Sequence, residues 1–372
     1  MPADIGLDAL LTPELRALRV EAEEFSADAV SRYGSFNDSW LCSFSRECSR
    51  ELAARGWIGM TWPVEFGGGG RSAVERLIVS EALIAAGVPI GASWFGDRQM
   101  GPGLYTFGTP EQRERYLPPI LAGEITWCIG MSEPDSGSDL ASLTTSAVRD
   151  GDEWIINGRK IWTSFAHESE YCYLICRTAS VPGRPHLGIS EIIVPMDSPG
   201  IEVRPIRDMV DARHFNEVWF DDVRVPIGNL VGVEGDAFSQ TMRQLDHERG
   251  GIDRLVSNRA LHLRVLETAD TSDVLIRDTI ARLETDFVAA RLLVYRSALG
   301  LVPKGFSAGT KLLCTHYEQR VADFASAVLG PEAMLWDRWT KEIAYAPAYT
   351  IMAGTSDVMR NIVGERVLGL PR

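Results

Sequence analysis

The segment Leu245–Arg249, Leu-Asp-His-Glu-Arg, places a carboxylate beside a guanidinium in a stretch with helical periodicity. On a helix, Glu248 shares a face with Leu245 and Ile252. A carboxylate held among apolar side chains could accept a proton, which is the work of a general base. A solvated surface charge is the ordinary interpretation of a helical glutamate next to an arginine. The segment alone favours that ordinary interpretation.

Two loop segments carry several hydrogen-bond donors. Proline and glycine fix the loop Ser132–Asp139, whose hydroxyls and N–H groups suit the rim of a ring system or a pyrophosphate. A plain structural loop is the alternative there. Near the C-terminus Gly354 allows an unusual turn, and Thr355 and Asp357 are plausible caps of a helix that begins beside it. The free N–H groups of such a helix start could instead bind an anion or a polarised carbonyl.

Two further segments admit both a ligand and a structural interpretation. The indole in Trp162–Ser164 could belong to the core or could stack on a planar cofactor, and the core is favoured from the sequence alone. The glycine-rich stretch Gly67–Ser72 has no lysine before its hydroxyl residue and does not follow a strand. It is therefore interpreted as a flexible turn and not as a phosphate loop.

Composition bounds the class of protein. At about 150 residues per domain, 372 residues make two or three domains. The 51 acidic residues exceed the 37 lysines and arginines by 14, and so acidic a surface disfavours nucleic acid as a partner. No apolar stretch reaches the roughly 18–20 residues that span a bilayer, and no secretory signal is visible. Six scattered cysteines lack metal-ligand spacing, so we expect a cytoplasmic protein with reduced thiols and no metal site.

The elements that would position these residues fall into three zones. Up to about residue 122 the pattern is helical, with helices expected over Pro13–Val30, Cys48–Gly56 and Val74–Ala86 and from the cap Thr109 onward. Residues 124–232 predict short strands of an antiparallel sandwich or barrel over Thr126–Gly130, Glu153–Ile156, Tyr171–Cys176 and Ser190–Val194. Turns are expected at Asp150–Asp152, Asn157-Gly158 and Pro199-Gly200. The chain becomes helical again from about residue 235, as in Leu275–Leu299.

Taken together, these segments resemble the flavin-dependent acyl-CoA dehydrogenase family over nearly the whole chain. The resemblance rests on separated blocks in the family's order: Phe107–Pro118, Ser132–Asp139, Asn157–Trp162, Asp221–Gly232 and Gly354–Pro371. It implies an α+β multidomain fold with an N-terminal helical domain (1–122), a middle antiparallel β domain (123–232) and a C-terminal four-helix bundle (233–372). Within the family, the pattern is most similar to actinobacterial members that act in steroid catabolism.

The resemblance also implies FAD and assigns residues to it. In the family, FAD lies against the middle domain and the start of the last loop. The positions that match its contacts here are Ile129, Met131, Ser132, Gly137, Ser138, Trp162, Ser164, Thr355 and Asp357.

The resemblance implies catalytic positions as well. Many members take the α-proton with a glutamate just before the Gly-Thr of the C-terminal loop, where this chain has Ala353. Others carry the base in a Leu-Asp-x-Glu-Arg helix, which matches Glu248. The Ala353 backbone N–H keeps the family's role of donor to the thioester oxygen. Arg249 either orients Glu248 or forms a structural ion pair.

By resemblance, the reaction is α,β-dehydrogenation of an acyl-CoA or acyl-carrier thioester to the trans-2-enoyl thioester. An electron-transfer flavoprotein is the expected electron acceptor, and the substrate is expected to be bulky, branched or cyclic. The bundle lacks the family's Arg-x-x-Phe-Gly segment and its Gln before Leu-Gly-Gly, both tied to FAD contacts between subunits. The resemblance implies a homo- or hetero-oligomer, dimer or tetramer. The alternatives are a flavin oxygenase or oxidase, and a non-catalytic partner subunit.

Overall fold

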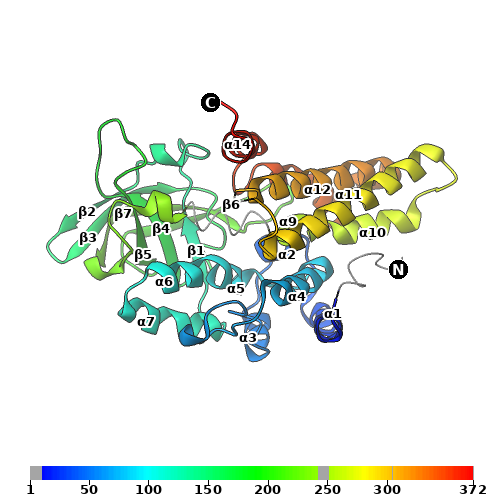
Figure 1. Ribbon diagram of the computed structural model, residues 1–372. Helices are drawn as coiled ribbons and strands as arrows, with labels where there is room; N and C mark the ends of the chain where they lie inside the picture. The colour runs from blue at the N-terminus through cyan, green and yellow to red at the C-terminus, as the bar shows by residue number, and fades with distance from the viewer. Residues whose placement is uncertain (1–10, 242–250, 304, 372) are drawn as a thin grey trace. The chain divides into compact units, whose positions relative to one another are not determined.

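The computed structural model describes residues 11–241, 251–303 and 305–371. The chain forms two compact units (Figure 1). The helical unit is drawn from Met1–Ser43, Arg71–Pro89 and Asp246–Arg372, and the sheet unit from Phe44–Gly70 and Ile90–Leu245. Each unit therefore combines segments that are distant in the sequence.

One sheet organises the sheet unit. Its strands are β1 (Trp127–Gly130), β2 (Ser146–Asp150), β3 (Glu153–Lys160), β4 (Tyr171–Arg177), β5 (Ile189–Pro195), β6 (Ile201–Ile206), β7 (Phe215–Pro226) and β8 (Leu230–Val231). The order is β6-β7-β3-β2-β4-β5-β8, with β1 paired to β4. Most neighbours are antiparallel, as expected, but β4 runs parallel to both β1 and β2.

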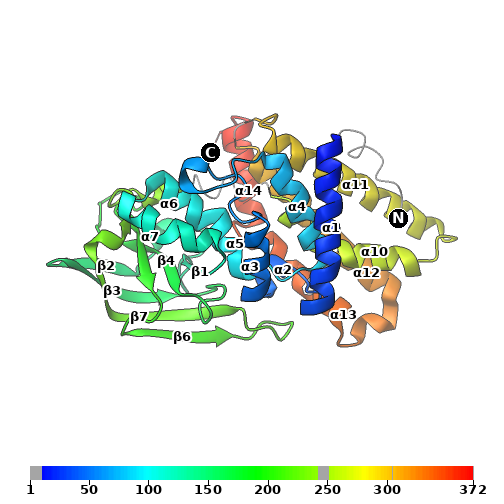
Figure 2. The same cartoon turned by 90° about the horizontal axis from the view of Figure 1, so that it is seen from below.

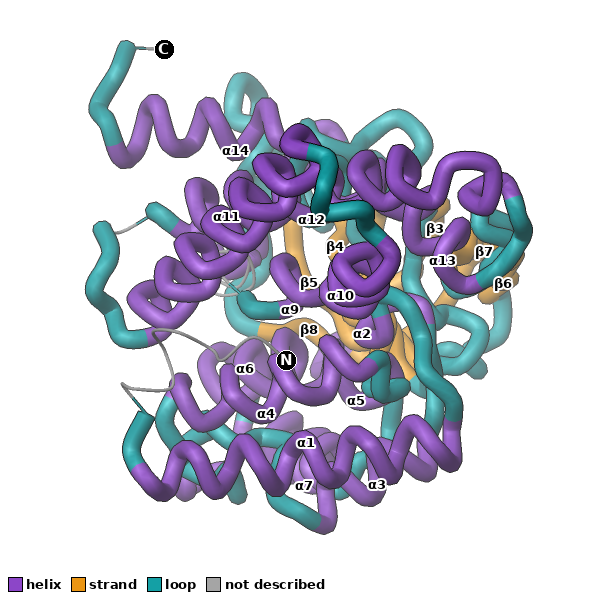
Figure 3. The backbone as a smooth tube through the Cα atoms, turned by 90° about the vertical axis from the view of Figure 1, so that its right-hand side faces the viewer, coloured by secondary structure: helices purple, strands orange, loops and turns teal. Residues whose placement is uncertain are grey.

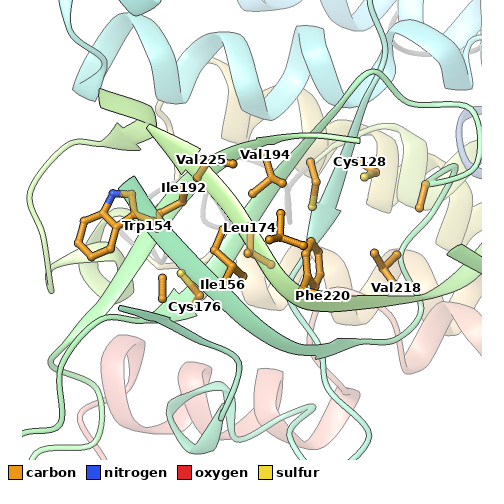
Figure 4. Packing of buried hydrophobic residues seen from close by; sticks show 14 residues of the cluster. Cys128, Trp154, Ile156, Leu174, Cys176, Ile192, Val194, Val218, Phe220 and Val225 are labelled. Atoms are coloured by element: carbon orange, nitrogen blue, oxygen red, sulfur yellow. The ribbon is translucent and has the colours of Figure 1, made fainter. Parts of the chain in front are cut away.

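The core of the sheet unit is a single cluster of buried side chains (Figure 4). Cys172, Leu174 and Cys176 alternate along β4 and all point into it. Ile192 of β5 and Val225 of β7 belong to the same cluster although their strands are not neighbours. The sheet must therefore curve around one core.

The expected turn at Asn157-Gly158 is wrong. Both residues lie inside β3, where the register with β7 shifts between Ile156 and Gly158. Gly158 has φ +147°, and a Cβ there would lie 2.5 Å from the Thr145 Oγ1. This is a β-bulge at which two strands approach closely, and Asn-Gly suits it for the same reason that it suits a turn. The Asp150–Asp152 turn is confirmed, since it joins β2 to β3.

The helices of the sheet unit are short. They are α3 (Arg46–Ala54), α5 (Gly91–Phe95), α6 (Gly101–Phe107) and α7 (Pro110–Leu121). Thr109 caps α7 as expected: its hydroxyl accepts from the Gln112 N–H, and the Gln112 amide oxygen accepts from the Thr109 N–H. The glycines of Gly67–Gly70 form a turn packed on Trp62, since a Cβ on Gly68 would lie 2.3 Å from the Trp62 carbonyl oxygen.

The helical unit is built from longer helices. Its members are α1 (Pro13–Tyr33), α2 (Ser39–Cys42), α4 (Ala73–Ala86), α9 (Asp253–Val256), α10 (Arg259–Thr268), α11 (Val274–Ala298), α12 (Ser307–Leu329), α13 (Arg338–Tyr345) and α14 (Ser356–Ile362). α1 lies along α4 (Figure 2), and α11 packs along α12 (Figure 3). α1, α4 and α11 match the helices expected from the sequence within a few residues.

Three other expectations concern the whole chain. All six cysteines are free thiols. Among the described residues, no group of three or more His, Cys, Asp or Glu side chains is placed to hold a metal ion. None of the helices in the described ranges is long and apolar enough to cross a membrane.

Candidate active site

Glu133 organises the loop that follows β1. Its Oε1 accepts from the Lys160 Nζ at 2.8 Å and from the Thr145 N–H at 2.8 Å. Its Oε2 accepts from the N–H and the hydroxyl of Thr144 at 2.7 and 2.8 Å. One carboxylate therefore ties the loop to the end of β3 and to the segment that enters β2.

The Glu133–Lys160 pair is almost completely removed from water, with 5% and 0% of the side chains exposed. Burial alone would raise the pKa of Glu133, but the Lys160 ammonium and the hydrogen bonds lower it to about 2. The Lys160 Nζ also donates to the Met131 carbonyl at 3.0 Å. The backbone of Met131, a predicted FAD contact, is thus held by a buried charge.

The structure brings Ser132 and the Trp162–Ser164 segment together. The Ile161 N–H donates to the Ser132 carbonyl at 2.9 Å, which joins the end of β3 to the loop after β1. Trp162 then takes φ +60°, a region that a bulky side chain rarely adopts, and its side chain is 54% exposed. Thr163 and Asn216 exchange two backbone hydrogen bonds at 3.0 Å, and these bonds hold the segment in place.

Trp162 therefore favours the ligand interpretation over the core interpretation. An exposed indole is held rigidly by strained backbone, which is the kind of arrangement found at functional sites. Beside it Ser164 is buried. The buried Thr163 Oγ1 has no hydrogen-bond partner among the described residues.

The other predicted FAD contacts of the sheet unit lie in β1 and in the loop that follows it. Ile129 is half-buried in β1, opposite Tyr173 of β4. Gly137 and Ser138 are exposed, and a Cβ on Gly137 would meet no described atom within 4 Å. The Ser136 hydroxyl closes their loop by donating to the Asp139 carbonyl at 2.8 Å.

The C-terminal loop lies in the helical unit. Ala353 has φ +52° and Gly354 φ +96°, so the backbone makes the unusual turn expected there. The Thr355 hydroxyl accepts from the Val358 N–H and caps α14, as predicted. Asp357 does not act as a side-chain cap, since its carboxylate pairs with Arg360 at 2.7 Å in the first turn. The Ala353 N–H has no hydrogen-bond partner among the described residues.

Glu248 and Arg249 lie outside the described residues, so the positions of the predicted base and its neighbour are not part of this geometry. The described chain is helical over 237–241, just before them.

A buried acid not anticipated from the sequence holds this helical stretch. Glu191 of β5 accepts from the Tyr173 hydroxyl at 2.8 Å, the Gln240 amide at 2.9 Å and the Thr241 hydroxyl at 2.8 Å. Burial raises the pKa of Glu191 to about 7, although the three donors oppose that shift.

Sequence reasoning also gave no role to Lys160 and Lys311. Lys311 of α12 is 1% exposed, and its Nζ donates to the Gly354 carbonyl at 2.6 Å. One signal was present in the sequence. Lys311, Cys314 and Glu318 recur at the spacing of one helix face, and all three are buried. A charged residue in such a stripe must be paired or must hold something.

The residues of the sheet unit fit a flavin. The strained, exposed indole of Trp162 and the unpartnered buried hydroxyl of Thr163 offer a stacking surface and a polar group. The loop with the open Gly137 is joined to them by the Ile161–Ser132 hydrogen bond. A flavin ring has the matching planar shape and polar edge.

Comparisons with known proteins identify the class. Residues 12–124 match the acyl-CoA dehydrogenase N-terminal domain, 128–223 its middle domain and 235–368 its C-terminal domain. The chain belongs to the acyl-CoA dehydrogenase family, a family of oxidoreductases that act on CH–CH bonds and use FAD. The expected fold class is thereby confirmed.

Three relatives show how similar this chain is to individual proteins. Acyl-CoA dehydrogenase IpdE1 of Mycobacterium tuberculosis is 38% identical over 342 residues, which cover 88% of each chain. The solved Tcur3481-Tcur3483 steroid ACAD has a TM-score of 0.87 and 31% identity, covering 97% of this chain and 99% of that one. The ChsE4-ChsE5 complex from Mycobacterium tuberculosis has a TM-score of 0.85 and 31% identity, with the same coverage.

Proposed function

We propose that this chain removes one hydrogen each from the α and β carbons of an acyl-CoA thioester, giving the trans-2-enoyl thioester. Family membership establishes the acyl-CoA dehydrogenase class, and the loop at Ala353 carries the proposal to this chain. Its N–H has no partner among the described residues, and its backbone is fixed in a left-handed turn. A donor held in this way suits the oxygen of a thioester.

The chemistry divides between two parts of the chain. The α-proton of a thioester is too weakly acidic for an ordinary carboxylate in water, so the developing enolate needs a hydrogen-bond donor. The Ala353 N–H supplies it, and a backbone donor does not depend on the side chain that this position carries. Glu248 takes the α-proton, and Arg249 orients that carboxylate. FAD, when bound, supplies the acceptor for the β-hydride.

The FAD contacts remain those that the resemblance assigned. Two features support them. Lys160, which is paired with Glu133, donates a hydrogen bond to the Met131 carbonyl, and the indole of Trp162 is exposed. The proposed contacts are Ile129, Met131, Ser132, Gly137, Ser138, Trp162, Ser164, Thr355 and Asp357. We likewise propose three domains, 1–122, 123–232 and 233–372.

We propose a bulky, branched or cyclic acyl chain as substrate. One of the solved relatives is named a steroid ACAD, and it matches this chain over almost its full length. Two of the solved relatives, the Tcur3481-Tcur3483 steroid ACAD and the ChsE4-ChsE5 complex, are also named for two proteins. These names support a hetero-oligomer. The electron-transfer flavoprotein as electron acceptor rests on the family resemblance.

An anaerobic panel tests the proposed reaction. The purified protein is mixed with butanoyl-CoA, octanoyl-CoA, isobutanoyl-CoA, cyclohexanecarbonyl-CoA and a steroid-derived acyl-CoA, and the flavin absorbance near 450 nm is followed. We expect bleaching and an enoyl-CoA product, fastest with the bulky thioesters. Fastest turnover with the straight chains would overturn the substrate class. Oxygen consumption coupled to turnover would show that the chain acts as an oxidase and not as a dehydrogenase.

A further inference from the structure

Lys311 is a lysine without access to water. It lies in α12 with 1% of its surface exposed, and its Nζ donates to the Gly354 carbonyl at 2.6 Å and approaches the Tyr349 carbonyl at 3.4 Å. Burying an ammonium group costs several kcal/mol unless its donors are used. Such a group is kept where its hydrogen bonds fix something, and here they fix two backbone carbonyls.

The two carbonyls bracket the turn that contains Ala353. Tyr349 is buried and precedes the turn, and Gly354 ends it with φ +96°. Ala353 takes φ +52° between them. A left-handed conformation costs a residue with a Cβ about 1–2 kcal/mol, so the turn needs an external restraint to persist. The Lys311 ammonium provides one at both ends.

We propose that Lys311 is a positioning residue, which holds the Ala353 N–H in the direction from which it donates to the thioester oxygen. The inference rests on the proposed function, because it assigns Lys311 to that donor. Lys311 itself touches neither substrate nor cofactor in this account. It acts through the Gly354 carbonyl, one residue from the donor.

The physical consequence of losing the ammonium follows from the loop geometry. Without it, the Gly354 carbonyl loses its partner and Ala353 relaxes out of the left-handed region, which turns its N–H away. Loss of one oxyanion donor typically lowers the rate constant by about 10²–10³. Displacement of the donor should cost at least about tenfold, and the ground-state binding of the thioester should change little.

Lys311→Met and the matched control Thr315→Val test the inference. Thr315 is equally buried, lies one turn further along α12, and its hydroxyl donates to the Lys311 carbonyl at 2.9 Å. Its replacement removes a buried hydrogen bond from the same helix and leaves the loop contacts intact. The probe is whichever panel thioester bleaches the wild-type flavin fastest.

Two readouts separate positioning from a merely structural role. In anaerobic stopped-flow, we expect the limiting bleaching rate of Lys311→Met to fall at least about tenfold, with a thioester Kd within about threefold of wild type. Thr315→Val should keep the wild-type rate. Amide hydrogen exchange, measured without substrate, should speed up over residues 350–356 in Lys311→Met alone.

The outcomes are distinct. A Lys311→Met protein that retains FAD and bleaches at the wild-type rate overturns the inference. If that variant loses FAD or fails to fold, Lys311→Arg decides. We expect its larger cation to fit the two carbonyls less well, so that hydrogen exchange over residues 350–356 speeds up and bleaching slows down. Faster exchange with bleaching at the wild-type rate would overturn the inference, because the turn would then not control the donor. A wild-type flavin that no thioester bleaches would overturn the proposed function, and the inference with it.

Discussion

Three of the buried ionisable groups in the described residues bear on the predicted site. The Glu133–Lys160 pair fixes the loop after β1, Lys311 fixes the turn at Ala353, and Glu191 fixes the helical residues 240–241. Each group costs free energy to bury and repays it by satisfying several partners. The first two held segments contain predicted site residues, and the third ends seven residues before the predicted base in the sequence.

Glu191 predicts how stability depends on pH. Its pKa is raised from 4.5 in an exposed carboxyl to about 7 in the fold, so its stabilising contribution is complete below about pH 4.5 and is lost as the pH rises through 7. Glu191→Gln mimics the protonated acid and should match wild type near pH 5. At pH 8.5 it should be more stable by up to about 3 kcal/mol. Urea unfolding at the two pH values measures the difference, and equal midpoints at pH 8.5 would refute it.

Replacing only Lys160 of the Glu133–Lys160 pair should destabilise the fold strongly, whereas replacing both residues should destabilise it little. Lys160→Met leaves a buried carboxylate without its cation, and we expect a loss of about 3–5 kcal/mol. Adding Glu133→Gln removes the uncompensated charge and should recover most of that loss. Denaturant unfolding at pH 7.5 and FAD content per chain provide the measurements. A double variant no more stable than Lys160→Met would show that the charge is not the cause.

At the scale of the elements, the β3 bulge shows what Gly158 contributes. Its Cβ would lie 2.6 Å from the Thr145 Cα, so Gly158→Ala must push β3 away from the segment that enters β2. We expect a loss of at least about 2 kcal/mol and weaker FAD binding, since Lys160 follows two residues later. Gly151→Ala is the matched control, because Gly151 also has positive φ but no described atom within 4 Å of its Cβ. Similar losses in the two variants would contradict this account, which melting curves can check.

The same elements show what the sequence could and could not predict. Helical periodicity of the apolar residues and the N-cap residue Thr109 predicted α1, α4, α7 and α11, because these signals are local in the sequence. Asn157-Gly158 was assigned to a turn because a bulge and a turn need the same residue types, and only the partner strand decides between them. The family motifs named the loop positions. The buried ions that hold those loops depend on contacts between distant segments, such as Lys311 with Gly354, which no motif contains.

At the scale of the whole molecule, the open question is which chains make up the enzyme. The bundle lacks the segments that the resemblance ties to FAD contacts between subunits, and two of the solved relatives carry two protein names. We expect the chain purified alone to be yellow, with FAD that is lost on dilution more readily than from a complex with its partner. Light scattering combined with absorbance near 450 nm gives mass and flavin content together. A colourless preparation would favour the non-catalytic partner subunit.

The role of Glu248 is tested most directly by one comparison of flavin bleaching. Wild type, Glu248→Gln and the control Glu267→Gln are mixed anaerobically with the best thioester of the panel. Glu267, a glutamate of α10, is exposed. We predict that Glu248→Gln binds the thioester but bleaches at least about a hundredfold more slowly, while the control matches wild type. Bleaching of Glu248→Gln at the wild-type rate would contradict the account.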